Sequence, residues 1–350
     1  MRVAFYSPYL DTLGGGERYL ATIAEFLSKK AEVNFFWDDK NIISKLQERF
    51  DLNFGKVAVA PDIFSKKINF FKKLAILRNY DLAIFLSDGS IPTPMAKKNI
   101  LHFQVPFTLE NGKSLVNRMK LLGYKAIVCN SDFTKKYIDK TYGIYSKVIY
   151  PPVDTSFFKP AEKKNLILSV GRFTRIFGGK KQEILIEVFK KMAKDGLNNW
   201  GLIVVGGTDD LSYVEKLKKE TEDCSIQILT NISAQNLKKL YGEAKIYWHA
   251  AGFGEDLETH PERAEHFGIS VVEAMSAGCV PVVFSGGGIP EIIDDGSNGF
   301  LWQTDKDLTS KTERLVQDHK LLGKLAREAQ AKAKKFSKRR FVEEFEKLLQ

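Results

Sequence analysis

Two carboxylates stand close together at the start of a predicted helix in the last third of the chain. Glu265 lies in a glycine-containing loop, and Glu273 lies in the first turn of the helix that we expect over 271–277. The start of a helix carries backbone N–H groups without partners, which bind phosphate or sugar oxygens. Two hydrogen-bond acceptors beside such donors suit a polyhydroxylated, anionic ligand such as a sugar nucleotide.

The same residues also fit a purely structural role. Ser270 followed by Glu273 has the spacing of a capping box, in which the two side chains only satisfy backbone N–H groups at the start of the helix. The tetrapeptide by itself favours this structural role, so the evidence for a ligand must come from the rest of the chain.

The composition is that of an ordinary globular protein with an excess of positive charge. The 350 residues, of which 44% are hydrophobic and 27% charged, suffice for about two domains. The formal net charge of +10 indicates an anionic partner: a nucleotide, a nucleic acid or a membrane surface. Because the sequence contains no aromatic-rich basic sheet and no recognition-helix motif, we expect no nucleic-acid partner.

Two stretches in the first half of the chain interleave cations with apolar residues. They run from Lys66 to Arg78 and from Lys113 to Lys125. Such stretches are typical of helices that lie in a lipid interface, but a solvated helix with one core-facing stripe has the same pattern. Since there are two of them, an anionic membrane surface is as good an interpretation as a solvated face.

The sequence predicts neither a membrane span nor a metal site. No apolar run reaches the ~18 residues that a spanning helix needs, and residues 1–6 read as a first strand rather than a signal peptide. The three cysteines are odd in number and far apart, and the acidic pairs 209–210 and 294–295 are typical of turns. We therefore expect a cytoplasmic protein without a metal or other cofactor, held peripherally at the inner face of the membrane.

Strand-length apolar runs alternate with helical patterns in both halves of the chain. This alternation predicts an α/β fold with two Rossmann-like domains, each a doubly wound parallel sheet. Pro151-Pro152 breaks the chain and 153–160 reads as a linker, so we place a boundary after residue 150. Strands are expected at 3–7, 33–37, 82–86, 99–103, 126–129, 147–150, 166–170, 202–205, 226–229, 246–250 and 280–284. Helices are expected at 15–30, 132–141, 182–194, 211–221, 234–242, 271–277 and 306–335, and the amphipathic segment 336–349 fits either domain.

Loops with glycines or cations follow several predicted strands. Two facing domains leave a cleft, and ligands of parallel sheets bind outside the carboxyl ends of the strands. The glycines at 14–16 open a helix and let the backbone approach a diphosphate. Arg172 and Lys180 follow another strand, where two cations can hold the phosphates of a leaving nucleotide. His102 also ends a strand. A tight turn, surface charge and a structural histidine are the respective alternatives.

Taken together, these motifs resemble the retaining family-4 glycosyltransferases, which have the two-domain GT-B fold. The resemblance covers nearly the whole chain, and its motifs are loose one by one but specific in this order. They are Gly14-Gly15-Gly16-Glu17, Asn130-Ser131-Asp132-Phe133, Tyr150-Pro-Pro-Val-Asp154, Val170-Gly-Arg172 with Lys180, Glu265 to Gly278, Pro281-Val-Val and Gly287-Gly288-Ile-Pro-Glu291. The His-x-x-x-Pro loop at His102 looks closest to enzymes that glycosylate lipid-linked acceptors.

The resemblance implies a role for each site residue. His102 would bond the transferred sugar, Glu265 would contact the sugar hydroxyls, and Glu273 would bind the ribose. The implied catalytic residues are His102, Arg172, Lys180 and Glu265, and the implied donor-binding residues are Gly15, Gly16, Lys181, Phe267, Gly268, Ile269, Ser270 and Glu273. The last helix, from about residue 336, would return to the N-terminal domain, which would then comprise 1–150 and 336–350, with 151–335 as the nucleotide-sugar-binding domain.

Two features depart from the family pattern. The loop from Phe173 to Gly179 is longer than the usual short turn, which makes Lys181 an alternative to Lys180 as the phosphate clamp. An acidic insertion at 254–264 precedes Glu265, and the sequence assigns it no role.

The resemblance implies a retaining, metal-independent hexosyltransferase, for example a mannosyltransferase. It would move a sugar from a GDP- or UDP-sugar to a hydroxyl of a lipid-linked glycan or another cell-envelope glycoconjugate, as in polysaccharide biosynthesis. The alternatives are an epimerase or phosphorylase of the same fold, a basic non-enzymatic binding protein, and an inactive scaffold subunit. Steeply salt-dependent DNA or RNA binding would identify the binding protein.

Overall fold

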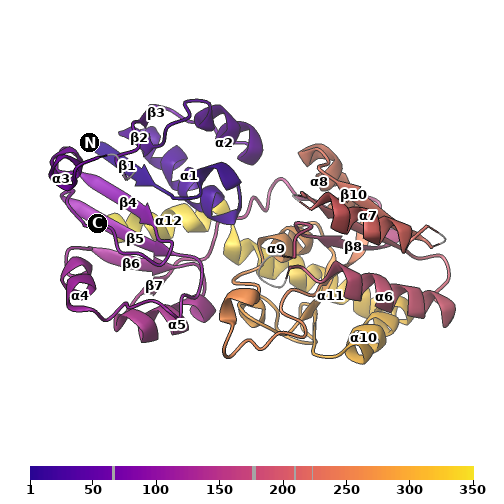
Figure 1. The fold of residues 1–350 in the computed structure, drawn as a ribbon. Coiled ribbons are helices and arrows are strands. Elements are labelled where there is room, and N and C mark those ends of the chain that lie inside the picture. The colour runs from indigo at the N-terminus through magenta and orange to yellow at the C-terminus, as the bar shows by residue number, and fades with distance from the viewer. Residues whose placement is uncertain (65–67, 176–178, 209, 223) are drawn as a thin grey trace. The chain divides into compact units, whose positions relative to one another are not determined.

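The computed structural model describes residues 1–64, 68–175, 179–208, 210–222 and 224–350 (Figure 1). The chain divides into two compact units, which are Met1–Pro152 with Lys338–Gln350 (unit 1) and Val153–Ser337 (unit 2). The corresponding boundaries in the sequence analysis lie after residue 150 and before residue 336. Of the features singled out there, Lys66, Lys67, Gly178 and Asp209 lie outside the described residues.

Unit 1 is built on a seven-stranded parallel sheet with the order β3-β2-β1-β4-β5-β6-β7. Its strands are Arg2–Tyr6 (β1), Glu32–Phe36 (β2), Val57–Ala60 (β3), Leu82–Leu86 (β4), Lys98–Phe103 (β5), Ala126–Cys129 (β6) and Lys147–Val148 (β7). The chain order reverses between β1 and β4, and the loops that follow strands near such a point are where parallel sheets bind ligands.

Helices cover both faces of this sheet. Val3 and Phe5 of β1 point into one hydrophobic core, whereas Ala4 between them belongs to the core on the opposite face. The helices of unit 1 are Gly15–Ser28 (α1), Ile42–Phe50 (α2), Phe70–Leu77 (α3), Leu115–Leu121 (α4), Asp132–Tyr142 (α5) and Lys338–Leu349 (α12).

The last helix, α12, packs in unit 1. Its apolar stripe, Phe341, Phe345 and Leu348, lies in the same core as α1. Phe341 meets the ring of Tyr19 edge-on, with 4.6 Å between ring centroids. The apolar side of this amphipathic helix thus covers part of one face of the first sheet.

Unit 2 repeats the architecture on a six-stranded parallel sheet with the order β10-β9-β8-β11-β12-β13. Its strands are Lys164–Val170 (β8), Gly201–Gly206 (β9), Ile226–Thr230 (β10), Ala244–His249 (β11), Val280–Phe284 (β12) and Phe300–Trp302 (β13). Its helices are Gln182–Lys194 (α6), Leu211–Lys219 (α7), Ala234–Glu243 (α8), Ile269–Ser276 (α9), Asp305–Gln317 (α10) and His319–Ala333 (α11). The predicted fold class, α/β with two Rossmann-like domains, is confirmed.

One predicted helix, 306–335, is wrong as a single element. The chain forms α10 and α11 instead, with Asp318 between them. The Asp318 side chain accepts a hydrogen bond from the Leu321 amide, which caps a new helix where the sequence shows only a continuous helical pattern.

Candidate active site

Three side chains meet at the loop that precedes α9. Lys180 Nζ lies 2.7 Å from Glu265 Oε2, and His249 Nε2 lies 3.0 Å from the same oxygen. Lys180 comes just before α6 and His249 ends β11, so distant parts of the chain converge on one carboxylate. The Glu265 side chain is 17% exposed. Its other oxygen, Oε1, has no hydrogen bond within the described part of the chain, which leaves an acceptor for a ligand.

The surroundings of Glu265 keep its carboxylate ionised. Burial alone would raise its pKa, but the Lys180 ammonium and the hydrogen bond from His249 outweigh burial and hold the pKa well below its ordinary value. Because a carboxylate only accepts hydrogen bonds, the proton in the His249–Glu265 contact belongs to His249 Nε2. The arrangement therefore presents a fixed, charged acceptor that suits hydroxyl donors.

The helix α9 starts two residues earlier than the sequence suggests. Its N-cap is Gly268, with φ 112°, and no side chain caps it. Ser270 therefore lies inside the helix, so the capping box with Ser270 as N-cap, one of the two interpretations of this segment, is wrong. Ser270 Oγ instead accepts a hydrogen bond from Tyr247 at 2.9 Å. Within the described residues, no side chain caps the amides at the start of α9 and competes there with a ligand.

Glu273 is a buried carboxylate within α9. It is 6% exposed, and its Oε2 accepts a hydrogen bond from the Tyr241 hydroxyl at 3.1 Å. Burial and the Glu273 charge raise the pKa of Tyr241 well above its ordinary value, so the tyrosine remains a hydrogen-bond donor. A contact of Glu273 with a ribose stays a prediction.

The cations around the site differ in how they are engaged. Lys181 Nζ lies 2.5 Å from Glu255 Oε1, so its charge is already paired. The Arg172 side chain is exposed and has no ion pair with any residue that the structure describes. Gln182 Nε2 donates to the carbonyls of Gly171 and Arg172 at 3.3 and 3.1 Å, which ties the loop after β8 to the start of α6.

Gly287 and Gly288 pack against the backbone carbonyl of Glu265. The Gly288 amide donates to the Glu265 carbonyl at 2.8 Å. A Cβ atom on Gly287 would lie 2.0 Å from that carbonyl oxygen, and Gly287 has φ +65°, so only glycine fits there. Phe267 is buried against Phe336, with 5.4 Å between ring centroids, and fixes the other side of the loop.

The glycine-rich start of α1 lies in unit 1. Glu17 accepts hydrogen bonds from the Gly14 amide at 3.0 Å and from the Thr12 hydroxyl at 2.9 Å, so this acid shapes the turn. Gly15 is exposed and Gly16 is buried. A Cβ on Gly16 would come within 1.7 Å of the end of the Gln104 side chain, which would have to shift.

His102 is almost fully buried in unit 1. It is 1% exposed, and its ring stacks on Tyr19 with 3.9 Å between centroids. Its Nδ1 lies 3.3 Å from the Val128 carbonyl oxygen. Burial lowers its pKa to about 3, so the ring is neutral at physiological pH. Its Nε2 has no partner among the described side chains, and its contact with a sugar stays a prediction.

Two residues of the cluster escaped sequence reasoning. His249 ends a strand just as His102 does, and this position is the signal that could have identified it. Glu255 lies in the acidic insertion, but nothing in the sequence relates it to Lys181, which is 74 residues away.

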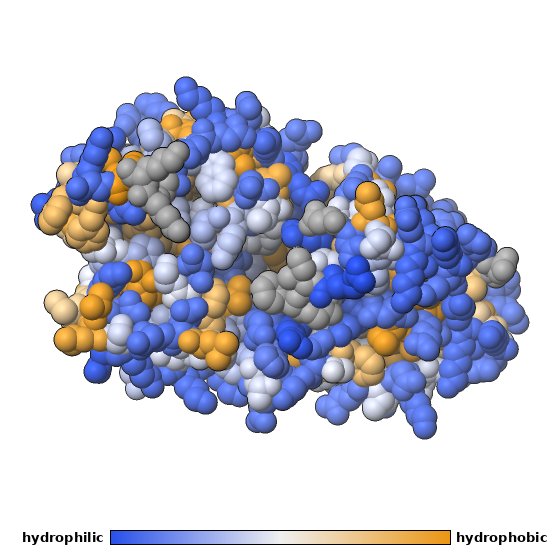
Figure 2. All heavy atoms as spheres, in the orientation of Figure 1, coloured by the Kyte–Doolittle hydropathy of each residue, from blue (hydrophilic) through white to orange (hydrophobic). Residues whose placement is uncertain are grey.

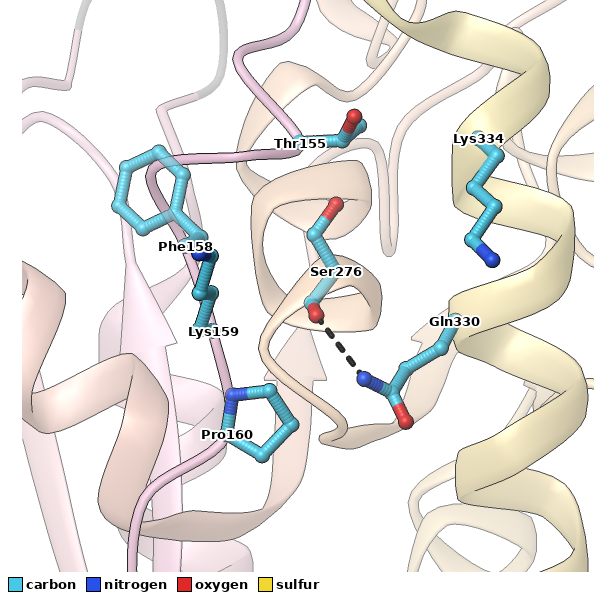
Figure 3. Close-up of a pocket in the computed structure, with 7 residues that line it drawn as sticks. All are labelled: Thr155, Phe158, Lys159, Pro160, Ser276, Gln330 and Lys334. Atoms are coloured by element: carbon cyan, nitrogen blue, oxygen red, sulfur yellow. Dashed lines mark hydrogen bonds between the residues drawn. The ribbon is translucent and has the colours of Figure 1, made fainter.

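No group of His, Cys, Asp and Glu side chains suited to a metal ion occurs among the described residues. A separate cavity of about 130 Å³ lies in unit 2. Gln330 donates a hydrogen bond of 3.3 Å to the Ser276 carbonyl at its edge, and Figure 3 shows these two residues with the rest of the lining. The cavity is lined by Thr155, Phe158, Lys159, Pro160, Ser276, Gln330 and Lys334, none of which is a predicted site residue.

Several curated relatives of this chain are mannosyltransferases, and others are named as a sucrose-phosphate synthase and a sulfoquinovosyl transferase. The chain is 26% identical over 248 residues to the GDP-Man:Man(3)GlcNAc(2)-PP-Dol alpha-1,2-mannosyltransferase of Dictyostelium discoideum, covering 64% of this chain and 47% of that protein. It is 24% identical over 377 residues to the alpha-1,3/1,6-mannosyltransferase ALG2 of Rhizomucor pusillus, covering 88% of this chain and 82% of that protein. The chain thus spans about half the length of the Dictyostelium relative.

Solved structures share the whole fold. A glycosyltransferase from Rickettsia africae superposes with a TM-score of 0.79 at 19% identity and covers 100% of this chain and 98% of its own. Anabaena HepE in complex with UDP and glucose superposes with a TM-score of 0.75 at 20% identity and covers 100% and 99%. The two parallel sheets therefore form the GT-B type of fold.

The family model for glycosyl transferases group 1 matches residues 154–336, which is more than half of the chain. This range contains Arg172, Lys180, Glu265 and Glu273 and the whole of α9. The chain belongs to the group 1 glycosyltransferases.

Proposed function

We propose that the protein transfers a hexosyl residue, with retention of anomeric configuration, from a GDP- or UDP-sugar to a hydroxyl group. The observation that carries this proposal is the Lys180–Glu265–His249 cluster in front of α9. Support for the donor class comes from relatives that are named for GDP-mannose and from the UDP complex of Anabaena HepE. Because these relatives are named as mannosyltransferases, we propose mannose as the transferred sugar.

The cluster offers a separate partner to each half of such a donor. A diphosphate would draw Lys180 away from Glu265 and would also meet the unpaired Arg172. Glu265 would stay in place through His249 and would accept hydrogen bonds from sugar hydroxyls. The two recognition events are coupled, because Lys180 can leave Glu265 at low cost only when another anion takes it.

These residues also suit the chemistry of the transfer. The bond between the sugar and the diphosphate breaks through an oxocarbenium-like transition state, and negative charge grows on the leaving oxygen. Lys180, Arg172 and the first amides of α9 stabilise that charge. The leaving oxygen takes the proton of the acceptor hydroxyl on the same face of the sugar. We propose that these cations suffice without a metal ion.

Nucleotide screening tests this proposal. GDP and UDP, each alone, should raise the melting temperature of the wild-type protein, and the sugar nucleotide with the better base should be consumed in the presence of EDTA. NMR of the product should show the anomeric configuration of the donor. Binding of neither nucleotide, or a product of inverted configuration, would overturn the proposal.

We propose further that the acceptor is a lipid-linked glycan and that unit 1 docks on the anionic cytoplasmic face of a membrane. Among the described helices none is long and apolar enough to cross a bilayer. The relative from Dictyostelium carries a dolichyl-diphosphate oligosaccharide in its name. A peripheral surface on the enzyme would let it reach such an acceptor.

The candidate docking surface consists of α3, α4 and Leu122. Six of the eleven large hydrophobic side chains that are exposed in the described part of the chain lie there, whereas unit 2 contributes only Leu211. They are Phe70, Phe71, Leu115, Val116, Met119 and Leu122. Figure 2 shows hydrophobic side chains gathered over α3 and α4, at the left of the view.

Charge and geometry favour an anionic bilayer as the occupant of this surface. Leu77 of α3 and Leu121 of α4 pack into the same hydrophobic core, so the two helices cover the same face of the first sheet. Neither helix contains an acidic residue, and Lys72 and Arg118 are exposed beside the hydrophobic side chains. Each cation near an anionic surface contributes ~1 kcal/mol of attraction.

A matched pair of leucines tests the docking surface. Leu122, the residue after α4, is 88% exposed, and Leu211 is 69% exposed in unit 2, so neither substitution to serine should disturb folding. Leu122→Ser should lower co-sedimentation with phosphatidylglycerol vesicles roughly tenfold, the effect of losing one buried leucine, and Leu211→Ser should leave it unchanged. Equal effects of the two substitutions, or equal binding to phosphatidylcholine, would exclude this surface.

A further inference from the structure

The acidic insertion at 254–264 is an ordered segment with its own internal bonds. Asp256 Oδ1 accepts hydrogen bonds from the amides of Glu258 and Thr259, at 3.1 and 3.4 Å. The His260 amide donates to the Asp256 carbonyl at 2.9 Å, and the short helix Pro261–Arg263 follows. Asp256 thus orders the segment, and its carboxylate accepts hydrogen bonds from two backbone amides and from the Thr259 hydroxyl.

Glu255 is the acid of this segment that reaches the donor site. Its Oε1 lies 2.5 Å from Lys181 Nζ, and its Oε2 lies 2.8 Å from Arg263 Nη1. The side chain of Glu255 is only 12% exposed. The hydrogen bonds from Lys181 and then Arg263 lower the pKa of Glu255, so the bridge is ionic at neutral pH.

Lys181 has an unusual backbone. It is the N-cap of α6 and adopts φ 54°, ψ 41°, the left-handed conformation. A residue with a side chain keeps this conformation only where its surroundings hold it. Glu255 holds the end of the Lys181 side chain, and the neighbouring Lys180 turns to Glu265 instead. Two adjacent lysines are therefore directed to two carboxylates ten residues apart in the chain.

We propose that Glu255 is a positioning residue of the donor site, which acts through Lys181 to place the Lys180 ammonium where a nucleoside diphosphate binds. Lys181 then serves to anchor the loop, and Lys180 is the phosphate clamp. The role of the insertion is then structural: the Glu255–Lys181 ion pair links the segment before Glu265 to the start of α6. This inference rests on the function proposed above, since it assigns a contributor to the same site.

Binding of GDP and UDP, each alone, to wild type and variants tests the inference. We expect Glu255→Gln, which keeps the shape but removes the charge, to weaken the better-bound nucleotide by roughly tenfold to a hundredfold, the range that misplacement of a site residue causes. The matched control is Glu258→Gln in the same segment, because the Glu258 side chain is exposed and has no partner among the described residues. The control should bind like wild type.

Substitutions of Lys181 separate positioning from mere stabilisation. Lys181→Gln should lose nucleotide affinity as Glu255→Gln does, and Lys181→Arg, which keeps a cation for Glu255, should recover most of it. This pair also decides the matter if Glu255→Gln fails to fold. A Glu255→Gln protein with a lower melting temperature but unchanged nucleotide affinity and donor KM would overturn the inference. If wild type bound neither nucleotide, the proposed function itself would fail, whereas normal wild-type binding with unaffected variants would refute the role of Glu255 alone.

Discussion

Substitution of Lys180 by methionine should destabilise unit 2 more than substitution of Glu265 by glutamine. Lys180→Met leaves an ionised, largely buried carboxylate with His249 alone, whereas Glu265→Gln leaves a lysine that is 33% exposed and can reach water. Two unit charges 4 Å apart attract by ~4 kcal/mol at an effective dielectric constant of ~20. Desolvation and solvent screening reduce this, so we expect a coupling energy of about 1–2 kcal/mol, below the ~3–5 kcal/mol that breaking a fully buried pair costs.

A double-mutant cycle measures that coupling. The free energy of unfolding in urea should be determined at pH 7 for wild type, Lys180→Met, Glu265→Gln and the double variant. Fluorescence is a suitable probe, because Trp248 and Trp302 are fully buried in unit 2. Additivity of the two substitutions within ~0.3 kcal/mol would show that the ion pair contributes nothing and would refute the electrostatic reasoning.

The coupling should also depend on pH in a defined direction. The pKa of Glu265 in the folded protein lies well below the ordinary 4.5, because Lys180 and His249 outweigh the opposing effect of burial. The unfolded chain therefore binds a proton at a higher pH than the folded one. The stability that the pair contributes is complete above pH ~4.5 and is lost progressively as the pH falls from there towards the folded pKa. Coupling that grew on acidification would contradict this assignment.

Other residues of the two units lead to further expectations. Gly287→Ala should lower the melting temperature clearly more than Gly296→Ala. Both glycines have positive φ, but of the two only Gly287 would bring the new Cβ against a backbone oxygen, at 2.0 Å. Glu273→Gln should weaken nucleotide binding by roughly tenfold at an unchanged melting temperature; a change in melting temperature alone would mark a structural carboxylate. The ring signals of His102 in NMR should not titrate between pH ~5 and ~8, because burial lowers its pKa to about 3. The stability that comes from keeping this ring neutral is complete above pH 6.5 and is lost as the pH falls from 6.5 towards 3.

Buried parallel strands were predictable because they read as short apolar runs. Leu82–Leu86 and Val280–Phe284 have the same bounds in the sequence analysis and in the structure, and both lie inside a sheet. The two strands that the sequence analysis missed, Val57–Ala60 and Phe300–Trp302, are edge strands of four and three residues. So short an apolar run is hard to distinguish from a loop, and no residue of Val57–Ala60 is fully buried.

Site residues were predictable where position alone identifies them. Lys180 and Glu265 follow strands and flank helix starts, and the structure places their side chains in contact. Their partners required the fold. His249 lies 16 residues from Glu265, and its ring reaches that carboxylate only because β11 ends beside the loop. Neither distance nor residue type in the sequence indicates such a pair.

The two neighbouring lysines show that residue type alone cannot identify the phosphate-binding side chain. From the sequence, Lys180 is the expected phosphate clamp, but its neighbour Lys181 remains an alternative. The left-handed backbone at Lys181 sends the two side chains to different carboxylates, Lys180 to Glu265 and Lys181 to Glu255. Lys180 shares its carboxylate with His249, so Glu265 keeps a partner when a diphosphate takes the lysine. Glu255 likewise has Arg263, but Lys181 would have to leave a more buried pair, with its own side chain 18% exposed against 33% for Lys180. The cost of desolvating an unpaired charge thus favours Lys180 as the residue that moves to the ligand.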